Sequence, residues 1–230
     1  MISRRDLLTG AGGLVVGAGA ASATAAGRWP APEPIPAVTP NEELMYDHGV
    51  LKRVLLCYRA LSRRLTAAQT VPANALATSA QLIRDYIESY HEGLEEAYVF
   101  PRLQAAGRHT DVVSILLTQH DRGRWLTSTL LDLAADPITT GAARTAVATK
   151  LDAFVAMYEP HEAWEDTLIF PAFRAVTPDR TWRLLAEQFA SEQDRLFGRN
   201  TMENMVNQVA DIEASLGIGD LSSFTPELGQ

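Results

Sequence analysis

The chain has 230 residues, with 20 basic and 28 acidic side chains and a formal net charge of −8. This balance argues against a nucleic-acid partner and favours a metal ion or a small molecule. A hydrophobic fraction of 47% and a charged fraction of 21% are ordinary for a globular protein, and the single cysteine, Cys57, excludes an intrachain disulfide.

The first 26 residues look like an export signal. Arg4 and Arg5 precede an apolar run rich in glycine and alanine, which ends in the small residues of 21–26. The segment resembles a twin-arginine signal, which implies export to the bacterial periplasm or the extracellular space. Residues 27–38 are rich in proline and are predicted to be a linker. No later run is long and apolar enough for a membrane span, so none is expected after signal removal.

Residues 39–216 are expected to form the folded domain, and residues 217–230 a tail. Thr39, Pro40 and Glu42 predict a capped helix start, because a threonine cap can pair with a glutamate three residues later and proline suits the first helical position. The spacing of apolar residues continues this helix to about Thr66.

Three further long helices follow in the same way. The predicted segments run from Pro72 to about Gly107, from about Thr110 to Ala134, and from behind Asp136-Pro137 to about Ala175. Thr177-Pro178 opens another helix that breaks near Gly198, and a last helix runs from Thr201 to Leu216. The sequence therefore predicts an all-α protein, an up-down-up-down four-helix bundle with one or two additional C-terminal helices.

Two stretches seventy residues apart are nearly the same. Residues 91–101 and 161–171 share the pattern H-E-x-x-E-(E/D)-x-x-(V/I)-F-P. In each copy a histidine and a glutamate stand four residues apart, on one helix face and roughly 6 Å from each other, so both can reach one metal ion. Imidazole with carboxylate suits iron, manganese or zinc.

A lone histidine precedes each copy, His48 by 43 residues and His120 by 41, so the chain is a duplicated helical hairpin. Four imidazoles and two carboxylates able to bridge form a ligand set for two metal ions. The predicted metal ligands are His48, His91, Glu95, His120, His161 and Glu165.

The duplicated H…HxxxE pattern resembles the hemerythrin-like (HHE cation-binding) family, from about Asn41 to Leu216. The resemblance implies two non-haem iron ions with an oxo or hydroxo bridge. It also implies a small diatomic ligand or peroxide as partner, so that the protein binds or senses dioxygen, peroxide or nitric oxide, or removes peroxide. If the protein is an enzyme, we expect a catalase-like or peroxidase-like oxidoreductase.

The sequence departs from the family's oxygen carriers at one position. Those carriers have a fifth histidine four residues after the third-helix histidine, where this chain has Arg124, and the matching first-helix residue is Lys52. This departure disfavours simple oxygen carriage. Arg124 is expected either to pair with a bridging glutamate or with Asp121, or to extend into water. Glu92 and Glu162 are expected to be solvated or to support the ligands, and Trp164 to lie in the core.

Two alternatives belong to other classes. A ferritin-like di-iron oxidase or iron store needs a Glu-x-x-His motif on two helices; Glu88 supplies one, but Tyr158 stands at the second position. A metal-free helical interaction module predicts that Glu95 and Glu165 are exposed.

Overall fold

The computed structural model describes residues 38–226, and all the regular secondary structure within that range is helical. The predicted signal at 1–26, nearly all of the linker and the last four residues lie outside the described residues. The helices, in chain order, are α1 (Pro40–Thr66), α2 (Ala75–Leu82), η1 (Ile83–His91), α3 (Glu92–Leu94), η2 (Glu95–Val99), α4 (Phe100–Ala105), α5 (Thr110–Ala134), α6 (Gly141–Trp164), η3 (Glu165–Ile169), α7 (Phe170–Val176), α8 (Asp179–Phe197), α9 (Thr201–Ser215) and η4 (Leu221–Phe224).

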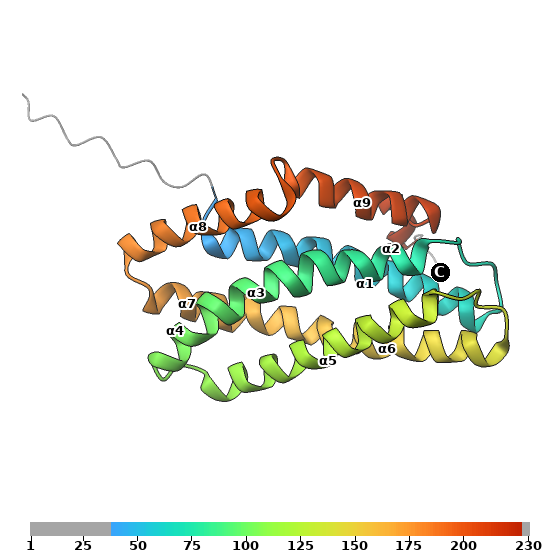
Figure 1. The fold of residues 1–230 in the computed structure, drawn as a ribbon, viewed down its shortest axis with the longest axis horizontal. Coiled ribbons are helices and arrows are strands. Elements are labelled where there is room, and N and C mark those ends of the chain that lie inside the picture. The colour runs from blue at the N-terminus through green and yellow to red at the C-terminus, as the bar shows by residue number, and fades with distance from the viewer. Residues whose placement is uncertain (1–37, 227–230) are drawn as a thin grey trace, which may run out of the picture. The chain divides into compact units, whose positions relative to one another are not determined.

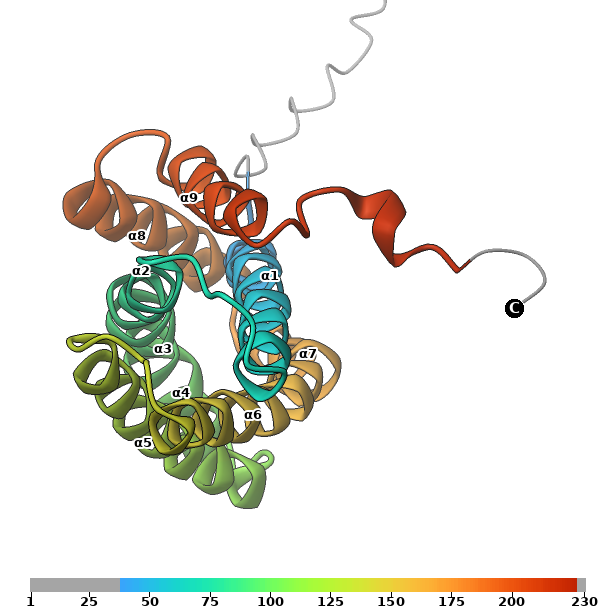
Figure 2. The same cartoon turned by 90° about the vertical axis from the view of Figure 1, so that its right-hand side faces the viewer.

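Consecutive segments join into four long rods: α1, α2 to α4, α5, and α6 to α7. Figure 1 shows successive rods running in opposite directions, and Figure 2 shows them around a common centre. α1 contacts α2 and α6, and α5 contacts the same two helices. Leucine, phenylalanine and tyrosine side chains fill the interior, and each such burial stabilises the fold by about 1.5–3 kcal/mol. The predicted all-α helical bundle is confirmed.

Local signals set the helix starts as predicted, with one shift. The Thr39 hydroxyl accepts a hydrogen bond from the Glu42 amide, and the Glu42 carboxylate accepts one from the Thr39 amide at 2.8 Å. The second rod begins at Ala75 rather than at Pro72. The Pro72 carbonyl accepts a bond from the Ala75 amide, so the residues between them form a turn before the helix.

The duplication is retained in the local backbone. Each copy of the motif contains a π-helical segment of five residues that begins at its second glutamate, η2 at Glu95 and η3 at Glu165. A further π-helical segment, η1, leads up to His91. π-Helical turns are rare and occur often at functional sites.

The C-terminal helices α8 and α9 lie against the outside of the bundle, beside α1 and α2 (Figure 2). Arg53 on α1 donates two hydrogen bonds to the Glu213 carboxylate on α9, at 2.9 and 2.6 Å. Phe197 at the end of α8 packs edge-on against Tyr86 and Tyr90 of the second rod. These helices therefore cover the side of the bundle opposite α5.

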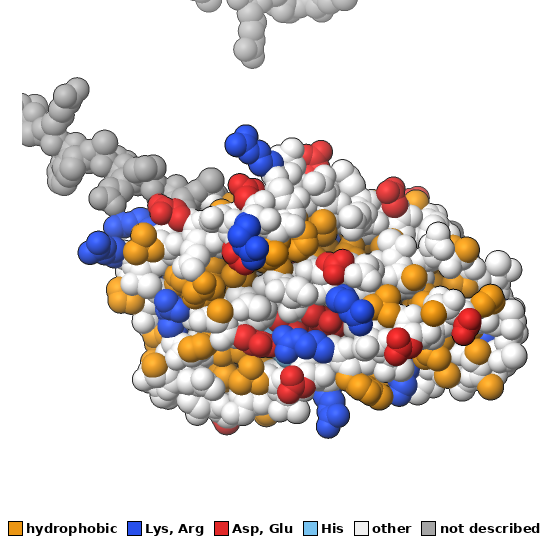
Figure 3. Space-filling view, viewed as in Figure 1, with side chains coloured by type: hydrophobic (Ala, Val, Ile, Leu, Met, Phe, Trp, Pro, Cys, Tyr) orange, Lys and Arg blue, Asp and Glu red, His pale blue; other side chains and the backbone are white. Residues whose placement is uncertain are grey.

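On the face in Figure 3, basic side chains are interspersed with acidic ones. Among residues 38–226, none of the helices combines the length and the apolar character that crossing a bilayer requires.

Candidate metal centre

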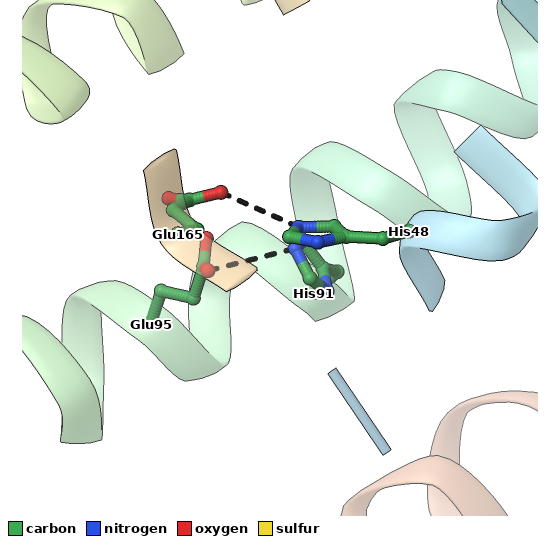
Figure 4. Close-up of side chains that lie close together, drawn as sticks. All are labelled: His48, His91, Glu95 and Glu165. Carbon is green, nitrogen blue, oxygen red and sulfur yellow. Dashed lines mark ion pairs between the residues drawn. The ribbon is translucent and has the colours of Figure 1, made fainter. Parts of the chain in front are cut away.

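The structure brings all six predicted donors together inside the bundle. We call them the six-donor cluster: His48 on α1, His91 ending η1, Glu95 opening η2, His120 on α5, His161 on α6 and Glu165 opening η3. None is more than 3% exposed. Figure 4 shows four of them, from three rods, pointing toward one another. The metal-free module predicts that Glu95 and Glu165 are exposed, and their burial contradicts that prediction.

The histidines form two pairs. The ring centroids of His48 and His91 are 4.7 Å apart, and those of His120 and His161 are 5.1 Å apart. Each pair joins two different rods, and one member of each pair is a lone histidine of the duplicated sequence. Each rod therefore contributes one histidine ring, and each half of the chain contributes one pair.

Each carboxylate lies close to one histidine of each pair. The nitrogen–oxygen distances are 3.6 Å from His91 Nε2 to Glu95 Oε1, 3.5 Å from His120 Nε2 to Glu95 Oε2, 3.3 Å from His48 Nε2 to Glu165 Oε2 and 3.1 Å from His161 Nε2 to Glu165 Oε2. Both carboxylates thus lie between the two histidine pairs.

The donor set fits a bound cation. Both carboxylate oxygens of Glu95 and of Glu165, with Nε2 of His48 and of His120, are buried and lack a hydrogen-bond partner. A buried polar atom without a partner costs about 1–3 kcal/mol, and more when it is charged. Six such atoms in one place would be a severe cost, which metal coordination removes. Groups from this cluster also have donor atoms within 4.8 Å of one another.

Electrostatics lead to the same conclusion. Burial, together with the charge of Glu165 beside it, raises the pKa of Glu95 well above its usual range. Burial alone would also raise the pKa of Glu165, but contacts with His161 and His48 hold it well below the usual range. Positive charge at the centre is therefore needed for both carboxylates to ionise.

Each histidine is held from behind by a polar side chain. Because Nε2 faces the centre, Nδ1 carries the proton and donates it. The acceptors and the distances from Nδ1 are Asp166 at 2.8 Å for His48, Asp47 at 3.2 Å for His91, Glu96 at 2.9 Å for His120 and Gln119 at 2.9 Å for His161. Three rings thus have a carboxylate partner, and one has a neutral amide.

These contacts affect the protonation of the rings. Burial alone would lower the pKa of His48, but the neighbouring carboxylates of Asp166 and Glu165 raise it to about 10. Burial lowers the pKa of His91 in spite of Asp47, and that of His120 in spite of Glu96. The acceptors Asp47 and Gln119 were missed from the sequence. Asp47 precedes His48, and its position on the buried stripe of the first helix was the available signal.

The two glutamates that directly follow motif histidines are buried rather than solvated. Glu92 is 1% exposed, and Arg124 Nη2 lies 2.9 Å from one of its oxygens. Glu162 is 3% exposed and forms an ion pair with Lys52. The basic residues that stand four positions after the lone histidines therefore cover two buried carboxylates beside the centre. Arg124 lies 3.7 Å from Asp121, one of its predicted partners, and it also pairs with Glu92 and Glu96 instead of a bridging glutamate.

Two aromatic side chains near the site differ in burial. Tyr158 is fully buried and donates a hydrogen bond to Glu92 at 2.6 Å. The prediction that Trp164 lies in the core is wrong, because its side chain is 54% exposed. It follows His161 by three residues, but it lies at the edge of α6 that faces α5, beside a surface pocket.

Comparisons with known proteins agree with this site. The model of the hemerythrin HHE cation-binding domain matches residues 39–173. Uncharacterized proteins of Mycobacterium bovis and of two strains of Mycobacterium tuberculosis are each 51% identical over 201 residues, covering 85% of this chain and 77% of the relatives. No solved structure matches significantly. The family match spans more than half of the sequence and includes all six donors, so the chain belongs to the hemerythrin HHE cation-binding family.

Proposed function

We propose that the six-donor cluster holds two iron ions and that the protein binds a small oxygen ligand, dioxygen or peroxide, at this centre. The observation that carries the proposal is the position of Glu95 and Glu165, each within 3.6 Å of a histidine from both pairs. A carboxylate between two imidazole pairs suits a bridge between two metal ions. One ion would be held by His48 and His91, the other by His120 and His161.

When bound in the ferrous state, two iron ions would supply two electrons to an oxygen ligand. The chain contributes the fixed geometry. The Nδ1 hydrogen bonds orient the four rings, and such bonds raise the basicity of a ligating imidazole. Burial of the cluster excludes bulk water, which strengthens every charge interaction inside.

Lys52 and Arg124 distinguish this centre from one with a fifth histidine. Both side chains are engaged with buried carboxylates, Glu162 and Glu92, and a cation cannot serve as a metal ligand. The position that an extra imidazole would fill would therefore be open to water or to the oxygen ligand.

The test is the reaction of iron-loaded protein with hydrogen peroxide, followed by an oxygen electrode and by the absorption spectrum. We expect peroxide to change the iron bands and to be consumed in proportion to bound iron. Glu95→Gln should lose iron and this reaction, while Glu203→Gln on the exposed face of α9 should keep both. A protein that binds two iron ions and responds to neither peroxide nor dioxygen would contradict the proposal.

A further inference from the structure

A surface pocket of about 290 Å³ lies between α5 and α6, next to the metal centre. Most of its wall is apolar, and two polar side chains belong to the hydrogen-bonded pair at the back of the centre. The lining residues that matter here are Ile115, Leu116, Pro160, Trp164, Gln119 and His161. Three other pockets are larger, of about 450, 480 and 640 Å³, and none of them is lined by any of the six donors.

Two large apolar side chains of this pocket remain in water. Ile115 is 57% exposed and Trp164 is 54% exposed. They stand on neighbouring helices on either side of one hollow, so a planar molecule between them would contact both. An indole ring presents a flat face on which another aromatic ring can stack.

The charges of the lining restrict the ligand. The lining contains no lysine or arginine, and its one acidic residue is Asp111. A carboxylate or phosphate ligand would therefore meet no counter-charge and would be repelled by Asp111. An uncharged ring that carries hydroxyl groups could donate a hydrogen bond to Asp111, so the pocket favours a neutral phenolic ligand.

The pocket is connected to the centre through two side chains. Gln119 lines the pocket and accepts the hydrogen bond of His161 Nδ1 at 2.9 Å. On the other edge of the ring, His161 Nε2 lies 3.1 Å from Glu165. A molecule in the pocket is therefore separated from the cluster by one imidazole ring, a short path for an electron.

We propose that this pocket binds a neutral hydroquinone and that His161 conducts its electrons to the metal centre. This inference rests on the proposed iron centre. The hydroquinone loses two electrons and two protons and becomes a quinone, and one molecule of hydrogen peroxide takes up two electrons and two protons to give two molecules of water. The Gln119 amide nitrogen donates a hydrogen bond to the quinone oxygen that forms.

Binding is tested with 2,3-dimethyl-1,4-naphthoquinone, whose substituted ring does not add thiols. The four tryptophans of the chain give four indole N–H signals in a nitrogen–proton correlation spectrum. We expect the Trp164 signal to shift on titration and the signals of Trp125 and Trp182 to stay. The affinity should fall roughly tenfold or more in Trp164→Ala, since a stacking face is lost.

Trp125→Ala is the matched control. Trp125 lies elsewhere on α5 and is 52% exposed, and the Lys150 ammonium of α6 lies 4.4 Å from the centre of its ring. Its removal should therefore leave the affinity unchanged. Ile115→Glu should weaken binding as Trp164→Ala does, because it adds a negative charge to the pocket. If all three variants bound the naphthoquinone as tightly as the unchanged chain, the proposal would be overturned. Dimerisation in sedimentation velocity that Trp164→Ala abolishes would also overturn it, because a second copy of the chain would then be the occupant.

Turnover is measured as quinone formed from 2,3-dimethyl-1,4-naphthohydroquinone and peroxide, with iron content determined for every sample. We expect the rate to fall in Trp164→Ala and Ile115→Glu but not in Trp125→Ala. Naphthoquinone binding at Trp164 in protein that takes up no iron would refute the proposed function and leave the pocket assigned. If the protein binds two iron ions but no naphthoquinone, the hydroquinone pocket is refuted and the proposed function stands.

Discussion

Gly123 in the middle of α5 should not tolerate even one methyl group. An ideal Cβ at this position would lie 1.9 Å from the Tyr158 hydroxyl oxygen and 2.8 Å from the ring carbon that bears it. Tyr158 is fully buried, and its hydroxyl donates to Glu92 at 2.6 Å. Gly123→Ala must therefore push the ring away and break this hydrogen bond beside the metal centre.

The expected magnitude is the balance of three effects. Alanine is favoured over glycine in a helix interior by about 1 kcal/mol. Against this, overpacking a buried site costs about 1–3 kcal/mol, and losing a hydrogen bond to a buried carboxylate costs about 1.5–3 kcal/mol. We expect Gly123→Ala to lower the free energy of unfolding by roughly 1.5–5 kcal/mol.

The assay is urea unfolding, with Gly49→Ala as the matched control. Gly49 is an exposed residue within α1, and its added Cβ would meet no atom within 4 Å. That variant should gain about 0.5–1 kcal/mol. In Gly123→Ala with Tyr158→Phe, part of the loss should return because the clashing oxygen is gone. If Gly123→Ala were as stable as Gly49→Ala, the close approach of Tyr158 would be refuted.

Three further predictions concern charged groups. Burial raises the pKa of Glu43 from 4.5 to about 7. Between these two values the folded state binds more protons than the unfolded chain, so the free energy of unfolding should fall as the pH rises. The urea midpoint should therefore fall between about pH 5 and about pH 8, and it should fall less in Glu43→Gln. Arg53→Ala, which removes the paired bonds to Glu213, should cost about 1 kcal/mol in urea unfolding, because the arginine is partly exposed, and equal stability would refute this. Glu165→Gln should lose bound iron by elemental analysis, and Glu159→Gln on the surface of the same rod should retain it.

Much of the site could be predicted because the chain contains the same hairpin twice. A single HxxxE pair is common on helices. Two copies, each preceded by a lone histidine at a similar distance along the chain, predict that four helices meet at one site. The helix ends followed from local chemistry, such as the Thr39 cap and Gly107. These signals act within a few residues, so they can be read without knowing the fold.

The contacts behind the ligands could not be predicted in this way. Asp47 holds a histidine of the second rod and Gln119 one of the fourth, and both contacts depend on how far each rod is shifted along its neighbour. The burial of Glu92 also depends on the neighbouring rod, because Arg124 covers it from α5. Helical period places Trp164 near the buried face, but the position of the adjacent helix leaves it in water.

The most direct test is the metal content of the chain, purified in air and reconstituted with ferrous iron, together with its absorption spectrum. The account predicts two iron ions per chain and near-ultraviolet bands of oxo-bridged ferric iron. Both should be lost when His48 and His120, one from each pair, are changed to alanine. A reconstituted chain that holds no transition metal, or whose metal content is unchanged in that double variant, would contradict it.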